Sequence, residues 1–420
     1  MKIKNLRSYI FKAYQLFLPI LAVIITISII CFPDEAFNAA LEGLNTWLAI
    51  VLPALLPFFI GSQLLMGLGV VHFMGVLLEP FMRPLFNVPG AGSFVMAMGL
   101  ASGYPVGSML TGKLVKNELC NTWEAERLMS FTNTADPLFM IGAVAVGMFK
   151  DARLGIIITL AHYISAIILG FIMRFYAKNK DITPLASTFK KQGSVFLRAT
   201  RELLRARKED GRPFGQLLGD CIKDSVNSLL MVLGFIVLFS VIIRIITVAG
   251  FIDIVSPVIE TILKAFGFDS SLAPAILSGF FEITLGTQLA SATSAPLMQR
   301  VIIVSSIIAW SGLSVHFQVI SMVSDTKIRI TPYIFARLLH AFLAGFVAYV
   351  LMITPIYSFE SFVIPAFAMS PQTTSESWLN IFKTSTEVFV LLFILVLLTS
   401  IITHLIKNLN IIGFKVIKKK

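Results

Sequence analysis

The chain has 420 residues, of which 56% are hydrophobic and only 14% are charged. Soluble domains average about 25% charged residues, so this composition excludes a soluble protein and predicts an all-α protein that crosses a membrane several times. The net charge of +11 would suit a nucleic-acid binder, but basic residues also mark the cytoplasmic side of membrane proteins, and we expect no nucleic-acid partner.

Hydropathy predicts about eight full membrane spans, each close to the ~20 residues that cross a bilayer. They cover residues 13–32, 44–66, 128–149, 154–176, 226–248, 301–323, 333–356 and 386–406. Two further apolar segments, 89–112 and 272–293, are rich in Gly, Ser, Thr and Pro. We predict that each is a re-entrant hairpin, which enters and leaves the membrane on one side. The alternative is that each is a full span.

The distribution of lysine and arginine favours the hairpins. With both segments re-entrant, the basic loops 67–127 and 174–223 and the basic tail 407–420 face the same side. The positive-inside rule makes that side cytoplasmic, together with both termini. If only the first hairpin were a full span, the bases of 174–223 would move to the outer face.

The layout of the two halves indicates an inverted repeat. Gly99 aligns with Gly279, and His162 aligns with His340, roughly 180 residues apart. The shared position of the two histidines favours a common structural role, such as a hydrogen bond between helices. The chain then divides into five parts. They are an N-terminal anchor helix (1–40), a first repeat (41–176), a basic cytoplasmic linker (177–223), a second inverted repeat (224–356), and a segment with an extracytoplasmic loop, the last helix and a basic tail (357–420). Interrupted helices in inverted repeats are typical of secondary transporters, whose substrate site lies at the repeat interface.

The first hairpin contains the run 99–107, with glycines spaced four residues apart. Such spacing suits close helix packing, but Pro105 within the run favours the tip of a hairpin. Free backbone amides near a tip suit an anion at a helix N-terminus. The candidate substrate contacts here are Ser102, Gly103, Tyr104 and Ser108.

Span 128–149 is interrupted by Asn133, Thr134 and Asp136, followed by Pro137. A carboxylate inside the bilayer costs about 2.5–3.5 kcal/mol on insertion scales and indicates a functional role by default. We assign Asn133 and Thr134 to substrate binding and Asp136 to a coupling ion or proton. The structural alternative is that Asp136 caps a half-helix that begins at Pro137.

The second hairpin carries the other intramembrane carboxylate, Glu282, which we assign to a coupling ion or proton; the alternative is an ion pair with Arg300 or Arg244. Polar side chains also interrupt span 301–323. Among them His316 is able to titrate near neutral pH, although a hydrogen-bonded packing histidine is an equal alternative. The candidate substrate contacts of the second repeat are Thr284, Thr287, Gln288, Ser311, Ser314 and His316.

Several stretches closely resemble the YlbJ (SpoVV) family of sporulation integral membrane proteins. The resemblance rests on residues 69–73, 79–92, 99–105, 124–128 and 130–139, and in the second half on 312–316. It extends over roughly 44–355 and implies that both repeats are nucleoside-recognition (gate) domains, similar in architecture to concentrative nucleoside transporters. It also implies a role in spore formation, in which the protein moves dipicolinic acid from the mother cell across the outer, mother-cell-derived forespore membrane.

We therefore expect a secondary transporter of a small organic anion, with dipicolinate as the substrate. A nucleoside transporter and a non-transporting membrane scaffold for spore assembly are the alternatives. The chain has no nucleophile–base set, and its three cysteines are scattered, so we expect neither an enzyme nor a metal or cofactor. The coupling ion, proton or sodium, stays open, and so does assembly into a homo-oligomer or with other sporulation membrane proteins.

Overall fold

The computed structural model describes residues 19–20, 22–178 and 194–354. The regular elements in these ranges are all helices, which confirms the predicted fold class. Four helical stretches there are long and apolar enough to cross a membrane, and bent pairs raise the number to at most six. The four correspond to the spans predicted at 154–176, 226–248, 301–323 and 333–356. They are α8 (Arg153–Met173), α10 (Phe214–Val248), α14 with α15 (Leu297–Trp310 and Gly312–Val323) and α16 (Thr331–Ile353).

The predicted number of eight spans is not reached in the described part of the chain. The span at 386–406 and the whole segment 357–420 lie outside it, as does most of 13–32. The span predicted at 44–66 falls in a long helical run that consists of α2 (Pro33–Thr46), a π-helical turn η1 (Trp47–Val51) and α3 (Leu52–Gly67). The chain bends by 105° between residues 22–31 and α2, and it bends again after α3, before the helix at 70–86.

The span at 128–149 is interrupted where its polar residues lie. Helix α7 (Thr122–Thr132) ends before Asn133, and a π-helix, η2 (Leu138–Met148), follows the break. A capping box at Asn121 and Glu124 fixes the start of α7. The polar sequence therefore predicted a real discontinuity in the helix.

Both hairpins are present. The first consists of α5 (Gly92–Ser102) and α6 (Val106–Lys116), and the second of α12 (Ala273–Phe281), preceded by the 3₁₀ turn η3 (Ser270–Leu272), and α13 (Ile283–Ala292). An 11-residue helix is about 16 Å long, roughly half the thickness of the hydrocarbon core. The arms are too short to cross a bilayer singly, so these segments are hairpins rather than full spans.

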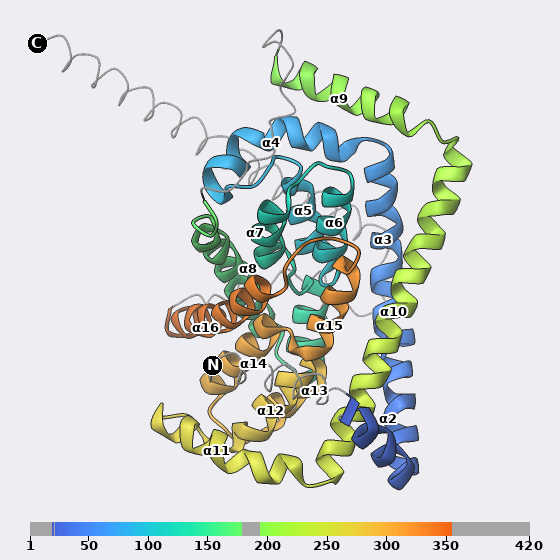
Figure 1. Ribbon diagram of the computed structural model, residues 1–420. Coiled ribbons are helices and arrows are strands. Elements are labelled where there is room, and N and C mark those ends of the chain that lie inside the picture. Colours follow the sequence, from blue (N-terminus) through green and yellow to red (C-terminus); the bar gives the residue numbers. More distant parts are fainter. Residues whose placement is uncertain (1–18, 21, 179–193, 355–420) are drawn as a thin grey trace, which may run out of the picture. The chain divides into compact units, whose positions relative to one another are not determined.

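Two amphipathic helices that the sequence analysis did not predict flank the hairpins. Helix α4 (Val70–Phe86) precedes the first hairpin and α11 (Phe251–Ala265) precedes the second. Each begins after a glycine in the left-handed conformation, Gly69 with φ 85° and Gly250 with φ 74°, which allows a sharp turn out of the preceding long helix. Figure 1 shows α4 (blue) and α11 (yellow) at opposite ends of the helix bundle, as an inverted repeat requires.

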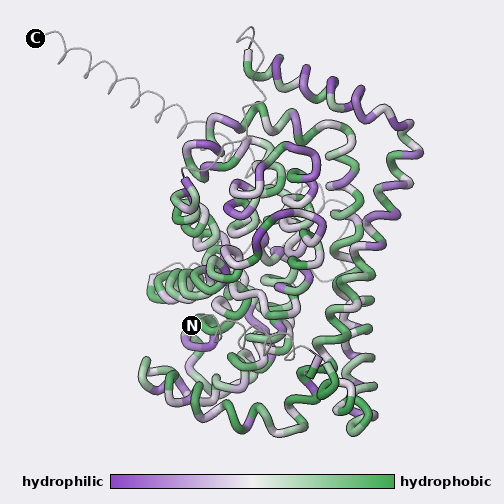
Figure 2. The backbone as a smooth tube through the Cα atoms, viewed as in Figure 1, coloured by the Kyte–Doolittle hydropathy of each residue, from purple (hydrophilic) through white to green (hydrophobic). Residues whose placement is uncertain are grey.

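The order of elements is the same in both halves: a long helix, an amphipathic helix, a hairpin, a broken helix and a final span. Helix α16 packs against α14 of its own half and against α8 of the other, while α10 packs against α2 and α3. A further helix, α9 (Val195–Asp210), lies in the predicted linker 177–223 and packs against α4. Figure 2 shows many hydrophilic residues (purple) along α9 and mostly hydrophobic ones (green) in the second half of α10.

Candidate functional site

The tip of the first hairpin touches the break of the next helix. Gly103 has φ 77°, and a Cβ atom added to it would stand 2.8 Å from Oδ2 of Asp136. Thr134, in the same break, donates to the carbonyl oxygen of Gly99 at 3.1 Å. Gly103 is therefore required both for its backbone conformation and for the close approach of Asp136.

The second repeat has the same contact with the roles exchanged. Here the glycine lies in the helix break: Gly312 has φ 71°, and an added Cβ would stand 2.9 Å from the carbonyl oxygen of Phe281 and 3.1 Å from the Cα atom of Glu282. The break between α14 and α15 thus contacts the tip of the second hairpin. In both repeats, a hairpin tip and a broken helix form one polar unit.

Both intramembrane carboxylates cap a helix. Oδ1 of Asp136 accepts from the amide of Phe139 at 2.8 Å, and Oε2 of Glu282 accepts from the amide of Leu285 at 2.8 Å. Each side chain is partly exposed. The structural alternative for Asp136 is therefore present, and it is compatible with a role in coupling because a carboxylate that accepts a hydrogen bond keeps its charge.

The alternative ion pair for Glu282 is absent from the described residues. Arg300 instead donates to the carbonyl oxygen of Ser291 at 2.8 Å, and Arg244 pairs with Glu35 at 2.6 Å.

The residue that sequence analysis missed is Arg337, in the second turn of α16. Its side chain is 0% exposed. Nη1 donates to the carbonyl oxygen of Asn133 at 2.9 Å, and Nη2 donates to that of Ala309. One guanidinium thereby holds the carbonyl ends of α7 and α14, the first halves of the two broken helices. Because these carbonyls carry the partial negative charge of helix C-termini, the position suits a cation.

No carboxylate among the described residues forms an ion pair with Arg337. The ring of Tyr333 lies near it, with its centroid 5.9 Å from Cζ of Arg337. Through its bonds to Asn133 and Ala309, the buried positive charge of Arg337 contacts the broken helices of both repeats.

Aromatic rings and an amide surround this guanidinium. Nδ2 of Asn133 donates to Oη of Tyr333 at 2.7 Å. The ring of His316 lies 5.4 Å from that of Tyr333 and 4.4 Å from that of Trp310, between centroids, and its Nδ1 bonds to the carbonyl oxygen of Gly312 at 2.7 Å. The structure thus places Asn133 and His316 beside Arg337 and Tyr333, although they are far apart in the sequence.

Several buried polar atoms in this region have no hydrogen-bond partner among the residues that the structure describes. Buried polar groups are paired in the great majority of cases, so these atoms are the natural contacts for a polar substrate or for water. They are Oγ of Ser102, Oη of Tyr104, Oγ of Ser108, Oδ1 of Asn133, Nε2 of His316 and Nε of Arg337. Five of the six residues were predicted as substrate contacts.

The other predicted contacts bond within their own helices or lie outside this cluster. Thr287 donates to carbonyl oxygens of its own helix, and Ser311 donates to that of Trp310. Ser314 accepts from Gln318 at 3.4 Å. Thr284 is partly exposed and Gln288 is exposed. Their roles in substrate binding stay predictions.

The two equivalent histidines meet at the crossing of α8 and α16. Nε2 of His340 lies 3.1 Å from the carbonyl oxygen of His162, and Nε2 of His162 accepts from the amide of Ala135 at 3.0 Å. This pair forms the helix-to-helix contact that their repeat positions predicted. Among the described residues, no group of three or more His, Cys, Asp or Glu side chains is placed to hold a metal ion.

Comparison with known proteins agrees with this architecture. A family model described as "Gate: Nucleoside recognition" matches residues 48–179 and 229–326, that is, parts of both repeats. The chain is also 42% identical over 362 residues to the sporulation integral membrane protein YlbJ of Bacillus subtilis (strain 168), which covers 85% of this chain and 86% of the relative. With its broken helices, buried arginine and this degree of identity, the chain belongs to the YlbJ family of sporulation integral membrane proteins and carries nucleoside-recognition gate domains.

Proposed function

We propose that the protein is a secondary transporter of a small organic anion, and that its substrate is dipicolinate, carried from the mother cell across the outer forespore membrane. Interrupted helices at the interface of two repeats are the usual place of a transporter's substrate site. The sporulation role of the relative supports a substrate that the spore requires. The gate-domain match supports recognition of a small planar molecule.

The observation that carries the proposal is the buried guanidinium of Arg337. A buried charge without a counter-ion is costly, and an anion bound beside it would offset that cost. Arginine has five N–H donors, so Arg337 is able to hold the carbonyl oxygens of Asn133 and Ala309 and still donate from Nε to a carboxylate. This cation would also offset the repulsion between an anionic substrate and the carboxylates Asp136 and Glu282.

The surroundings of Arg337 suit a flat aromatic acid. The rings of Tyr333, His316 and Trp310 lie in succession on one side of the site, and aromatic rings stack favourably at such separations. The free hydroxyl groups of Tyr104 and Ser108 are additional donors for carboxylate oxygens. We assign Asp136 and Glu282 to a coupling proton or cation, since each is a carboxylate at an interruption of the helices, and Asp136 lies against the tip of the first hairpin.

A nucleoside is the rival substrate, favoured by the description of the matching family model and by the unpaired amide oxygen of Asn133, which could accept from a base. A scaffold that transports nothing is the rival from another class. It would require the site residues only for folding.

Uptake into proteoliposomes separates these functions. The purified protein and its Asp136→Asn variant are reconstituted and tested with labelled dipicolinate and labelled uridine under proton and sodium gradients. We expect dipicolinate uptake by the wild type and its loss in the variant. If only uridine is taken up, the substrate is a nucleoside and not dipicolinate. If folded protein takes up neither compound under either gradient, the proposal of transport is contradicted.

A further inference from the structure

Helix α9 packs closely on the bundle through one face only. Ala199 is fully buried, and the carbonyl oxygen of Leu203 approaches Gly69 so closely that an added Cβ would stand 2.5 Å from it. The ring of Phe196 meets that of Phe73 edge-on at 5.6 Å. This contact face fixes α9 against α4 and against the turn between α3 and α4.

In the predicted topology, the contact with Gly69 places α9 at the membrane surface. Gly69 lies three residues beyond the cytoplasmic end of the span predicted at 44–66. The headgroup layer extends roughly 5–8 Å beyond the hydrocarbon core on each side. A helix that touches residue 69 therefore lies at the level of the lipid headgroups of the cytoplasmic leaflet.

The face of α9 turned away from the bundle combines apolar and basic side chains. Leu197 and Leu204 are 46% and 62% exposed. Positions 197, 201, 204 and 208 follow the spacing of one helical stripe, so Arg201 and Lys208 alternate with the two leucines. Neither base is in an ion pair with a described residue, whereas Arg205 is bonded to Glu209 at 2.8 Å. Apolar residues bordered by free bases are the pattern of helices that lie in a membrane interface.

We propose that α9 binds the anionic phospholipids of the cytoplasmic leaflet. Leu197 and Leu204 enter the boundary between headgroups and acyl chains, while Arg201 and Lys208 bind lipid phosphates. Charge complementarity identifies the occupant, because the cytoplasmic leaflet is the anionic one. The proposal is independent of the substrate that the protein carries.

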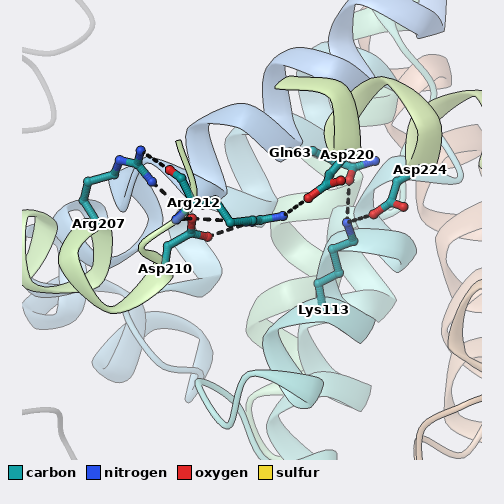
Figure 3. A network of polar contacts seen from close by, with 7 residues as sticks. All are labelled: Gln63, Lys113, Arg207, Asp210, Arg212, Asp220 and Asp224. Atoms are coloured by element: carbon teal, nitrogen blue, oxygen red, sulfur yellow. Dashed lines mark hydrogen bonds and ion pairs between the residues drawn. The ribbon is translucent and has the colours of Figure 1, made fainter. Parts of the chain in front are cut away.

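A cluster of charged residues at the turn between α9 and α10 holds α9 in this position (Figure 3). Arg212 donates from Nε and Nη2 to Asp210 and from Nη1 to Asp220 at 2.8 Å. The bond from Arg212 holds the pKa of Asp210 below its usual range, so this carboxylate is charged at neutral pH. This charged cluster therefore connects the end of α9 to the first turns of α10.

A second polar cluster joins α10 to the first hairpin. Lys113 of α6 donates to Gln63 of α3 at 2.7 Å and lies 3.8 Å from Asp224 of α10. Figure 3 shows Lys113 reaching from α6 toward Gln63 and Asp224, with Arg212 and Asp210 on the other side of Asp220. Helix α10 therefore carries polar contacts both to the end of α9 and to the hairpin whose tip lies in the candidate site.

Lipid titration of the full-length protein in detergent tests the proposal. An environment-sensitive fluorophore is attached at Leu204→Cys in a background in which Cys31, Cys120 and Cys221 are replaced by Ser, and phosphatidylglycerol or phosphatidylcholine is added. We expect a blue shift with phosphatidylglycerol at much lower concentration than with phosphatidylcholine. The double variant Arg201→Gln/Lys208→Gln should weaken the phosphatidylglycerol response by about fivefold per cation removed.

The matched control is Arg153→Gln/Lys264→Gln, which removes two exposed bases from the opposite, predicted outer side. It should leave the response unchanged. Equal responses to both lipids, an unchanged affinity in the α9 double variant, or a probe that stays in water in liposomes containing phosphatidylglycerol would overturn the proposal. In the last case α9 would be a surface for a soluble partner.

Discussion

Nε2 of His340 bonds to the carbonyl oxygen of His162 at 3.1 Å, and the two rings lie 4.7 Å apart between centroids. These residues occupy equivalent positions of the two repeats, separated by 178 residues. The contact joins α8 to α16 at the level where both broken helices are interrupted, because His162 also accepts from the amide of Ala135. The repeats are therefore fastened together beside the candidate site.

The histidine pair predicts a stability defect. His162→Ala leaves the amide of Ala135 buried without an acceptor, which should lower the free energy of unfolding by about 1–3 kcal/mol. His340→Ala should cost a similar amount, and the double variant less than the sum of the two, because each single variant also removes the contact between the two rings. Denaturant unfolding of the purified protein measures this. Strict additivity would show that the two residues act separately.

The tip of the first hairpin predicts that Gly103 cannot be replaced. Gly103→Ala places a Cβ atom against Asp136 in a left-handed conformation that alone costs about 1–2 kcal/mol. We expect lower thermal stability and loss of uptake. Gly234→Ala on α10 is the matched control, since an added Cβ meets no atom within 4 Å there. A variant at Gly103 as active and stable as this control would be evidence against the close packing of tip and break.

The carboxylates Asp136 and Glu282 allow capping and coupling to be separated. Asn is as good a helix cap as Asp, so Asp136→Asn keeps the bond to the amide of Phe139 and removes only the charge. We expect an unchanged unfolding midpoint but a loss of gradient-driven uptake, with substrate binding retained. Glu282→Gln should behave in the same way. If both variants keep gradient-driven uptake, these carboxylates are caps and nothing more.

Glu126 and Arg329 join the two halves of the chain. Glu126 is 1% exposed, and Arg329 contacts both its oxygens, at 2.8 and 2.9 Å. Arg329→Gln leaves this buried carboxylate without its cation, so the protein should melt at a lower temperature. Adding Glu126→Gln should recover part of the loss. Arg153→Gln, at an exposed pair with Asp151, is the control and should change little.

Much of the fold could be predicted from the sequence because hydropathy reports continuous apolar helices. The spans that became α8, α10 and α16 are uninterrupted, and the breaks at 103–105 and 133–137 are marked by Gly, Pro and Asp. Helices α4 and α11 were missed because Pro80, Pro84 and Pro257 and several charged residues reduce their apolar character. Their amphipathic pattern was the signal that could have found them.

The candidate site could be predicted only in part. Asn133 and His316 lie at helix breaks, and polar residues at such breaks are recognisable along the chain. Arg337 could not be singled out, since its burial depends on how α16 packs between α7 and α14. No local pattern around position 337 reports this packing. The alignment of the two repeats could have drawn attention to a charged residue three positions before His340.

The most direct test of the account is the binding of dipicolinate to purified protein by titration calorimetry, compared between the wild type and Arg337→Gln. Because truncating one side of a buried charge pair typically costs 2–5 kcal/mol, we expect at least about 30-fold weaker binding. Arg244→Gln, at an exposed ion pair, is the matched control, and Arg337→Lys tests a variant that keeps the charge if Arg337→Gln unfolds. Dipicolinate binding of equal affinity in the wild type and a folded Arg337 variant, or no binding to the wild type, would contradict the central claim.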